Sequence, residues 1–218
     1  MNILAIDTCT EITSITLSAD GDKSTRVLRD VAKSSGHILK LCDEVFSEAG
    51  VKLDYVDVIA YTKGPGAFTG VRMCVGVVQG LSLSANIPVI GFSTLELLGY
   101  RAAKHLNCRA IAVALDARMG EVYWGVYQQG ILSDEKICNP SEVSKLSSEF
   151  VGVGSGWLVY TNELKAASGV EHIDSEVFPK SSSLVGLVVE AFNNGVKASF
   201  ELAQPTYLRN NVAQKSVK

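Results

Sequence analysis

The two halves of the chain open with the same pattern, which reads ILAIDTCTEITSITLS at residues 3–18 and AIAVALDARMGEVYWGVY at residues 110–127. In each half an apolar run ends in an aspartate, Asp7 or Asp116, and a polar corner leads into a second β-type stretch. An apolar run followed by turn residues and a further strand predicts an antiparallel hairpin. The repeated opening indicates an internal duplication.

The rest of the chain alternates between strand-type and helix-type segments, so we expect an α/β protein. The boundary between the halves falls near Asn107, which predicts lobes at residues 1–106 and 107–218. The polar stretch 128–149 stays unassigned, and the tail from Asn193 is expected to be extended and partly mobile. Further strands are expected at residues 24–28, 58–61, 89–90 and 150–153, and helices at 38–49, 71–83, 95–105 and 184–192.

Composition and charge exclude several classes of protein. Hydrophobic residues make up 47% of the 218 residues, too many for a disordered chain. Twenty Lys and Arg against 23 Asp and Glu give a net charge of −3, which argues against a dominant electrostatic grip on nucleic acid. The five cysteines are widely spaced and form no CxxC pair, which argues against a disulfide scaffold and favours the reducing cytoplasm. The N-terminus lacks the pattern of a signal peptide.

Residues 73–95 carry no charge and are long enough to cross a bilayer. The sequence Asn86-Ile87-Pro88 interrupts this run, because a proline disfavours helix in the residue before it. We therefore expect a helix followed by a short strand, and no membrane span.

A glycine-rich turn, Thr62 to Arg72, lies between a strand and a helix and contains Gly64 and Gly66. Backbone N–H groups at a helix N-terminus can hold a phosphate, but the turn is neither a Walker A loop nor a GxGxxG motif. The alternative is a tight turn that needs glycine dihedral angles, and spacing alone favours it. If a nucleotide binds, the candidate residues are Asp7, Gly64, Gly66 and Asp116, whereas carboxylates at strand ends are also common turn residues.

Small residues recur every four positions at Gly76, Gly80 and Ser84, so they share one face of the expected helix. Such a face lets another helix approach closely, either within the same fold or in a partner. The histidines at 37, 105 and 172 are scattered, and no metal site of the usual spacing is visible.

The chain resembles the bacterial TsaB family, also called YeaZ, in several separate segments. The most specific are GPGAFTGVRMCVGVVQGL at residues 64–81 and ALDARMGEVYWGVY at residues 114–127. ILAIDTCTE, IPVIGFSTLELL and the closing PTYLRNNVAQK are also similar, whereas the stretch 128–203 is only loosely so. The resemblance implies an actin-like ATPase fold made of two ribonuclease-H-like lobes with mixed sheets flanked by helices.

The resemblance also implies a function in making N6-threonylcarbamoyladenosine, the modified base beside the anticodon of some tRNAs. In that pathway the paralogue TsaD transfers the threonylcarbamoyl group, and the TsaB-type subunit holds TsaD in a working assembly with the ATPase TsaE. Contact with tRNA would then be only indirect. In the absence of TsaD the same surface is expected to form a homodimer. ATP or ADP could lie at the partner interface, although no cofactor is required.

Pairing through the N-terminal lobe is implied by the family, and it assigns the partner surface to the two expected helices at residues 38–49 and 71–83. The residues assigned to this surface are Ile38, Leu41, Cys42, Val45, Val71, Met73, Gly76, Val77, Gly80 and Ser84.

TsaD carries a metal-binding His-x-x-x-His in the segment that resembles Gly91 to Leu98. Here the two ligand positions are Thr94 and Leu98, and neither side chain can replace an imidazole on iron or zinc. The resemblance therefore implies a non-catalytic accessory subunit without a metal. An independent nucleotide-dependent phosphotransferase that uses Asp7, Asp116 and the glycine turns is the alternative, and the missing ligands argue against a metallopeptidase.

Overall fold

The computed structural model describes residues 1–29 and 36–209, so the last residues of the predicted extended tail lie outside the described part. The first sheet contains five strands in the order β3-β2-β1-β4-β5. Strand β1 pairs antiparallel with β2 and parallel with β4. The bounds are β1 Ile3–Asp7, β2 Thr13–Ala19, β3 Asp22–Leu28, β4 Val58–Thr62 and β5 Val89–Phe92.

The second sheet repeats this topology, since its order β10-β9-β6-β7-β8 is the same arrangement read from the other edge. Strand β6 pairs antiparallel with β7 and parallel with β9. The internal duplication and the actin-like, two-lobed fold are therefore confirmed. The bounds are β6 Ala110–Asp116, β7 Val122–Gln128, β8 Ile131–Cys138, β9 Val151–Val153 and β10 His172–Asp174.

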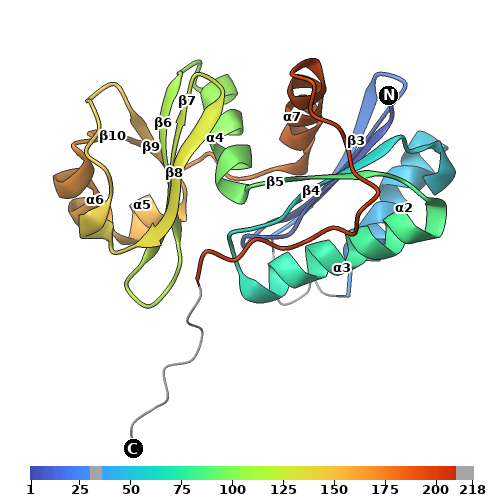
Figure 1. The fold of residues 1–218 in the computed structure, drawn as a ribbon, viewed down its shortest axis with the longest axis horizontal. Coiled ribbons are helices and arrows are strands. Elements are labelled where there is room, and N and C mark those ends of the chain that lie inside the picture. Colours follow the sequence, from blue (N-terminus) through green and yellow to red (C-terminus); the bar gives the residue numbers. More distant parts are fainter. Residues whose placement is uncertain (30–35, 210–218) are drawn as a thin grey trace, which may run out of the picture.

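Helices cover the outer face of each sheet, and the two lobes differ most in this layer (Figure 1). Helix α2, Ile38–Ala49, and the 18-residue helix α3, Phe68–Ala85, pack on the first sheet. The second sheet has the shorter α5, Ser155–Val159, and α6, Thr161–Ser168. Helix α3 begins three residues before the predicted start, so Gly70 belongs to its first turn.

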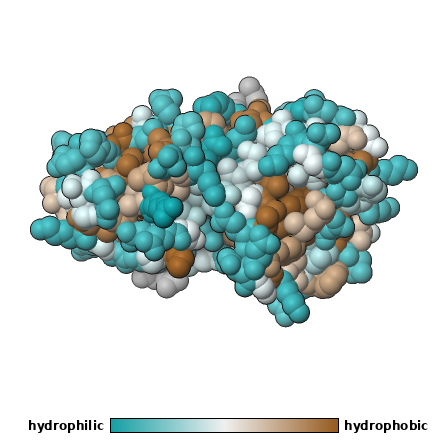
Figure 2. Space-filling model, turned by 90° about the horizontal axis from the view of Figure 1, so that it is seen from above, coloured by the Kyte–Doolittle hydropathy of each residue, from teal (hydrophilic) through white to brown (hydrophobic). Residues whose placement is uncertain are grey.

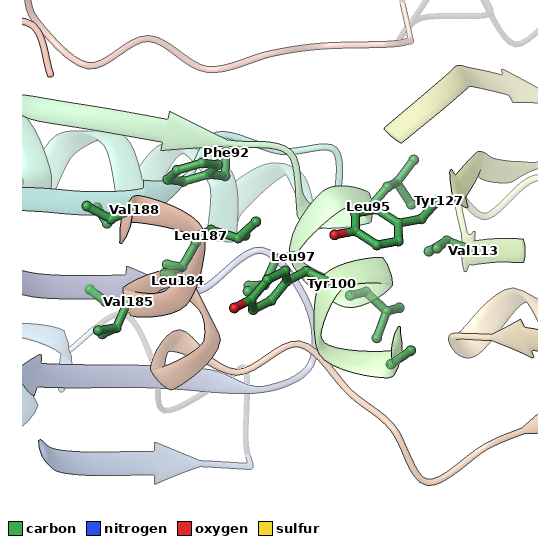
Figure 3. Packing of buried hydrophobic residues seen from close by; sticks show 14 of the residues in the cluster. Phe92, Leu95, Leu97, Tyr100, Val113, Tyr127, Leu184, Val185, Leu187 and Val188 are labelled. Atoms are coloured by element: carbon green, nitrogen blue, oxygen red, sulfur yellow. The ribbon is translucent and has the colours of Figure 1, made fainter. Parts of the chain in front are cut away.

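The two remaining helices are exchanged between the lobes. Helix α4, Thr94–His105, follows the first sheet in sequence and packs on β6 and β7 of the second. Helix α7, Ser181–Asn193, follows the second sheet and packs on β1, β2 and β4 of the first. The helices also pack against each other, and Figure 3 shows Leu97 and Tyr100 of α4 beside the leucines of α7.

This exchange corrects the predicted boundary at residue 107 for the end of the chain. Residues 181–208 pack mainly on the first lobe, and Arg209 reaches the second. The backbones of Ser199 and Val89 exchange two hydrogen bonds, and Gln79 Nε2 donates to Ala203 O at 2.7 Å.

The buried clusters also show how the two lobes are joined. One buried cluster joins both lobes around α4 and α7, while one cluster belongs to the outer side of each sheet.

Among the described residues, one helix is long and apolar enough to cross a membrane by length and composition, and it is α3. Cys74, Val75 and Val78 on this helix are buried in the core of the first lobe. Seen from above, the largest gathering of apolar residues lies on the N-terminal lobe, and polar residues cover the outer ends of both lobes (Figure 2).

Candidate functional site

A cavity of about 580 Å³ forms a cleft between the two lobes. Its walls come from the corner after β1, the start of α3, the β6–β7 corner and the chain end. Of the four predicted nucleotide residues, Gly66 and Asp116 line this cleft and Asp7 and Gly64 do not. The lining includes Cys9, Thr10, Glu11, Phe68, Arg72, Leu115, Arg118, Met119, Tyr123, Ser155, Tyr207, Leu208 and Arg209.

Asp7 is fully buried and does not line the cleft, so its side chain cannot contact a nucleotide directly in this conformation. Its Oδ1 accepts hydrogen bonds from Thr62 Oγ1 at 2.7 Å and from Cys9 N at 3.3 Å. Its Oδ2 has no hydrogen-bond partner within the described part of the chain. Burial raises the pKa of Asp7 to about 6, because an ionised carboxylate loses its hydration there and the two hydrogen bonds offset only part of that cost.

The glycine turn is built for close packing. A Cβ on Gly66 would lie 2.0 Å from Cys9 O, and one on Gly70 would lie 2.1 Å from Thr8 O. Gly64 has φ +102° and its Cβ would lie 2.7 Å from Thr206 O. The N–H of Ala67, just before α3, already donates to Cys9 O at 2.8 Å. These contacts support the tight-turn interpretation and explain each glycine without a phosphate.

Gly154 and Gly156, which follow β9, show the same behaviour in the second lobe. Cβ atoms there would lie 2.4 Å and 3.1 Å from Ala114 O, respectively. A Cβ on Gly152 would meet the Trp157 ring. This glycine run therefore serves the packing of β9 and α5 on β6.

Asp116 faces the cleft and is engaged by its own corner. Its Oδ1 accepts from Arg118 N at 2.9 Å, and its Oδ2 accepts from Arg118 Nη1 at 2.8 Å. The hydroxyl of Tyr160 lies 3.4 Å from Oδ1. Asp116 can therefore meet a ligand in the cleft, but its negative charge is already paired with Arg118.

The three cleft arginines also have partners within the chain. Arg209 Nη1 lies 2.6 Å from Glu121 Oε2, and Arg118 pairs with Asp116. Arg72 stacks on the Phe68 ring, 3.7 Å from its centroid, and its Nε donates to Tyr207 Oη at 3.2 Å. A polyphosphate would have to displace these contacts to gain its own.

Tyr207, Leu208 and Arg209 form a cleft wall that our sequence reasoning did not identify as functional. The signal for them was the closing Tyr-Leu-Arg segment of the family resemblance, which includes Tyr207 to Arg209. Phe68 and Arg72 were also missed, because they were treated only as part of the glycine turn.

The two positions that correspond to metal ligands in TsaD are both part of the packed interior. Thr94 begins α4 and is fully buried, and Leu98 lies in the cluster that joins the lobes. Within residues 1–29 and 36–209, no group of three or more His, Cys, Asp or Glu side chains is arranged to hold a metal ion.

The predicted partner surface divides into buried and exposed members. Ile38, Cys42, Val45 and Val71 are buried in the core of the first lobe, so the structure corrects their direct contact with a partner. Their side chains point inward because they form the apolar stripe with which α2 and α3 pack on the sheet. Leu41, Met73 and Val77 are half-buried, and Gly76, Gly80 and Ser84 are exposed.

No other part of the described chain packs against the exposed face of α3 at its two glycines. A Cβ on Gly76 or Gly80 would meet no atom within 4 Å. Two leucines that the sequence analysis missed lie exposed on these helices, Leu83 on α3 at 69% and Leu39 on α2 at 62%. Isolated leucines at polar positions of the helical pattern were the available signal.

Comparison with known proteins gives concordant results. A family model described as TsaD, tRNA N6-adenosine threonylcarbamoyltransferase, matches residues 31–216. The tRNA threonylcarbamoyladenosine biosynthesis protein TsaB of Escherichia coli K12 is 37% identical, with 100% of this chain and 98% of the relative covered. The TsaB protein of Haemophilus influenzae is 31% identical, with 100% and 97% covered.

Solved structures agree with these relatives. The structure of YeaZ from Pseudomonas aeruginosa has a TM-score of 0.84 and 34% identity, and the match covers 94% of this chain and 100% of that one. Component A of (R)-2-hydroxyglutaryl-CoA dehydratase from Acidaminococcus fermentans, at 11% identity and a TM-score of 0.52, shares the fold alone, over 90% of this chain and 100% of that one. Because a family model matches most of the chain and full-length relatives exceed 30% identity, the chain belongs to the TsaB (YeaZ) family.

Proposed function

We propose that this protein serves tRNA threonylcarbamoyladenosine biosynthesis in the cytoplasm as a non-catalytic subunit that binds and activates TsaD. Names of its relatives place the family in this pathway. The observation that carries the finer proposal is the exposed small-residue face of α3, an apolar helix whose Gly76 and Gly80 leave open space.

A helix packed against this face could approach closely, since no side chain separates the two backbones at Gly76 and Gly80. Leu83 and Leu39 add apolar area that association would remove from water. In the absence of TsaD the same face pairs with a second copy of the chain. TsaE joins the larger assembly, and tRNA contacts this subunit only indirectly.

The non-catalytic role is supported by the buried Thr94 and Leu98 at the ligand positions of the paralogue. The subunit would then act by stabilising one conformation of TsaD over others, and its effect is limited by its differential affinity for those conformations.

Reconstitution tests the proposal. Purified TsaD, TsaE, threonylcarbamoyl-adenylate and unmodified tRNA are combined with and without this chain, and modified adenosine is measured by nucleoside mass spectrometry. We expect product only when TsaD and this chain are both present. Equal product without this chain, or product without TsaD, would show the proposal to be wrong.

The surface is tested separately with Gly76→Leu, which fills the open face without touching the core. We expect at least a tenfold loss of affinity for TsaD, because a bulky side chain prevents close backbone approach. Asn162→Leu, a change at an exposed position of α6, is the control. Unchanged TsaD binding by a folded Gly76→Leu variant would contradict the assignment of this face.

A nucleotide at the partner interface is a second, narrower proposal, favoured by the meeting of Gly66 and Asp116 in one cleft. Calorimetry with ATP and ADP, on the chain alone and with TsaD, tests it. Binding only in the presence of TsaD would support a junction site. Tight binding with turnover by the isolated chain would support the phosphotransferase alternative.

A further inference from the structure

The last described residues of the chain connect the two lobes across the mouth of the cleft. Gln204 N donates to Tyr61 Oη at 3.1 Å, and Thr206 N donates to Lys63 O at 2.7 Å, so the segment is anchored at the end of β4. Three residues later, Arg209 reaches the β6–β7 corner of the other lobe. We call residues 204–209 the C-terminal clasp.

Arg209 supplies hydrogen bonds and an ion pair from the clasp to the C-terminal lobe. Its Nη1 lies 2.6 Å from Glu121 Oε2, its Nη2 donates to Ala117 O at 2.9 Å, and the side chain is only 18% exposed. Charge-assisted hydrogen bonds in a partly buried place are stronger than exposed ion pairs. A second ion pair across the cleft, Arg118 with Glu11, is long at 3.9 Å and both side chains are exposed.

The clasp also holds the other wall of the cleft. The Tyr207 ring lies 5.9 Å from the Phe68 ring, and its hydroxyl accepts from Arg72 Nε. Both partners belong to the first turns of α3. Movement of the clasp would therefore change the contacts of the first turns of α3 as well as those of the β6–β7 corner.

The corner that Arg209 holds has an uncommon backbone. Arg118 and Met119 have φ of 62° and 57°, in the left-handed region that non-glycine residues seldom adopt. Arg209 Nη2 donates to the carbonyl of Ala117 at the start of this turn. Loss of the guanidinium would remove a restraint on the turn and the link between the lobes at once.

The lobes are also joined on the opposite side, by the packing of α4 against α7 (Figure 1). We propose that the C-terminal clasp sets the opening of the interlobe cleft, with the α4–α7 contact as the hinge and Arg209 as the latch. Release of the latch allows the lobes to separate at the cleft while the shared core stays packed. This device belongs to the isolated chain and does not depend on the proposed partner.

Distance measurements on the full chain test the proposal. Nitroxide labels are placed at Ser47→Cys on α2 and Asn162→Cys on α6, with Cys108→Ser and Cys138→Ser removing the half-buried thiols. We expect Arg209→Ala to widen the interlobe distance distribution by about twofold, as a released hinge motion does. Glu121→Gln should widen it less, because the carbonyl contact of Arg209 remains. Arg109→Ala, which removes an exposed arginine of the C-terminal lobe that does not line the cleft, is the control and should leave the distribution unchanged.

Hydrogen exchange of the same variants shows whether Arg209 restrains the opening of the cleft or stabilises only the turn that it contacts. If the clasp sets the opening, Arg209→Ala speeds exchange at residues 117–121 and also at residues 65–71, which Arg209 does not touch. Faster exchange confined to 117–121, or an unchanged distance distribution in a folded Arg209→Ala variant, would overturn the proposal.

Discussion

At the end of β1, Asp7 accepts a hydrogen bond from Cys9 N at 3.3 Å, and at the end of β6, Asp116 accepts one from Arg118 N at 2.9 Å. The two corners thus share the same side-chain-to-backbone turn. Their surroundings differ, because Asp7 is sealed in the interior while Asp116 faces the cleft. Both strand ends keep the aspartate and its hydrogen bond to a backbone N–H, whereas only the second corner has left-handed residues, at Arg118 and Met119. The elements packed around each corner determine which carboxylate can meet a ligand.

The covering elements explain the difference. The glycine turn and the 18-residue α3 lie directly on the first corner, where Gly66 and Gly70 touch the carbonyls of Cys9 and Thr8. The equivalent segment of the second lobe is the five-residue α5, which packs beside Ala114. Ser155 Oγ of this helix accepts a hydrogen bond from Asp116 N at 3.1 Å, but the Asp116 corner still lines the cleft. The following substitutions test this comparison, from the largest expected effect to the smallest.

Alanine at the covering glycines should have the largest effect. Gly66→Ala places a Cβ 2.0 Å from Cys9 O, and Gly154→Ala places one 2.4 Å from Ala114 O at a φ of +104°. We expect each to lower the free energy of unfolding by roughly 3 kcal/mol, because backbone atoms must move. Gly76→Ala, which meets open space inside a helix, is the control and should stabilise by up to about 1 kcal/mol. Urea unfolding measures all three, and a wild-type midpoint for Gly66→Ala would contradict the close packing.

Asp7 should give the protein a pH-dependent stability. Its pKa is raised from 3.8 to about 6 in the folded state, so the stabilisation is complete below the unfolded pKa and is lost as the pH rises through 6. The loss between pH 4 and pH 7 should be on the order of 2–3 kcal/mol. In Asp7→Asn this component should vanish. Urea titrations at intervals from pH 4 to pH 7 measure it, and parallel profiles for wild type and Asp7→Asn would show that Asp7 is not the group responsible.

Asp116→Asn should have the smallest effect on stability. The Asp116 side chain is 8% exposed, but its partner Arg118 is 78% exposed, so water screens the ion pair from the arginine side. We expect a change of at most about 1 kcal/mol in the free energy of unfolding, read from thermal melts. A loss as large as that of Gly66→Ala would mean that the second corner is as tightly built as the first.

The sequence predicted the strands and helices of the first lobe well, because apolar periodicity and glycine or proline boundaries mark them clearly. It did not assign β8, whose stretch Ser133-Asp134-Glu135-Lys136 is polar because this strand lies at the edge of its sheet. Edge strands need no apolar alternation on their open side, so the pattern that identifies strands was missing there.

The sequence did not predict which residues surround the two aspartates, and the reason is different. Asp7 and Asp116 end similar apolar runs, and the residues that seal Asp7 come from about 60 positions further along the chain. The same limit applies to α2 and α3, where the pattern identified an apolar face but could not tell its buried side from its open side at Cys42 and Gly76. The exchange of α4 and α7 was also not predictable, because an apolar stripe does not specify which sheet it will cover.

That exchange has a consequence for how the protein is made. The inner face of the first sheet, with Ile3, Ala5 and Val58, packs in the same cluster as Leu184 and Leu187 of α7. A ribosome has therefore synthesised all the strands of both sheets before the helix that covers this face emerges. Domains usually fold as units while they are being synthesised. Here the N-terminal lobe must keep one apolar face uncovered until residues 181–193 arrive, so the two lobes reach their final packing together near the end of translation.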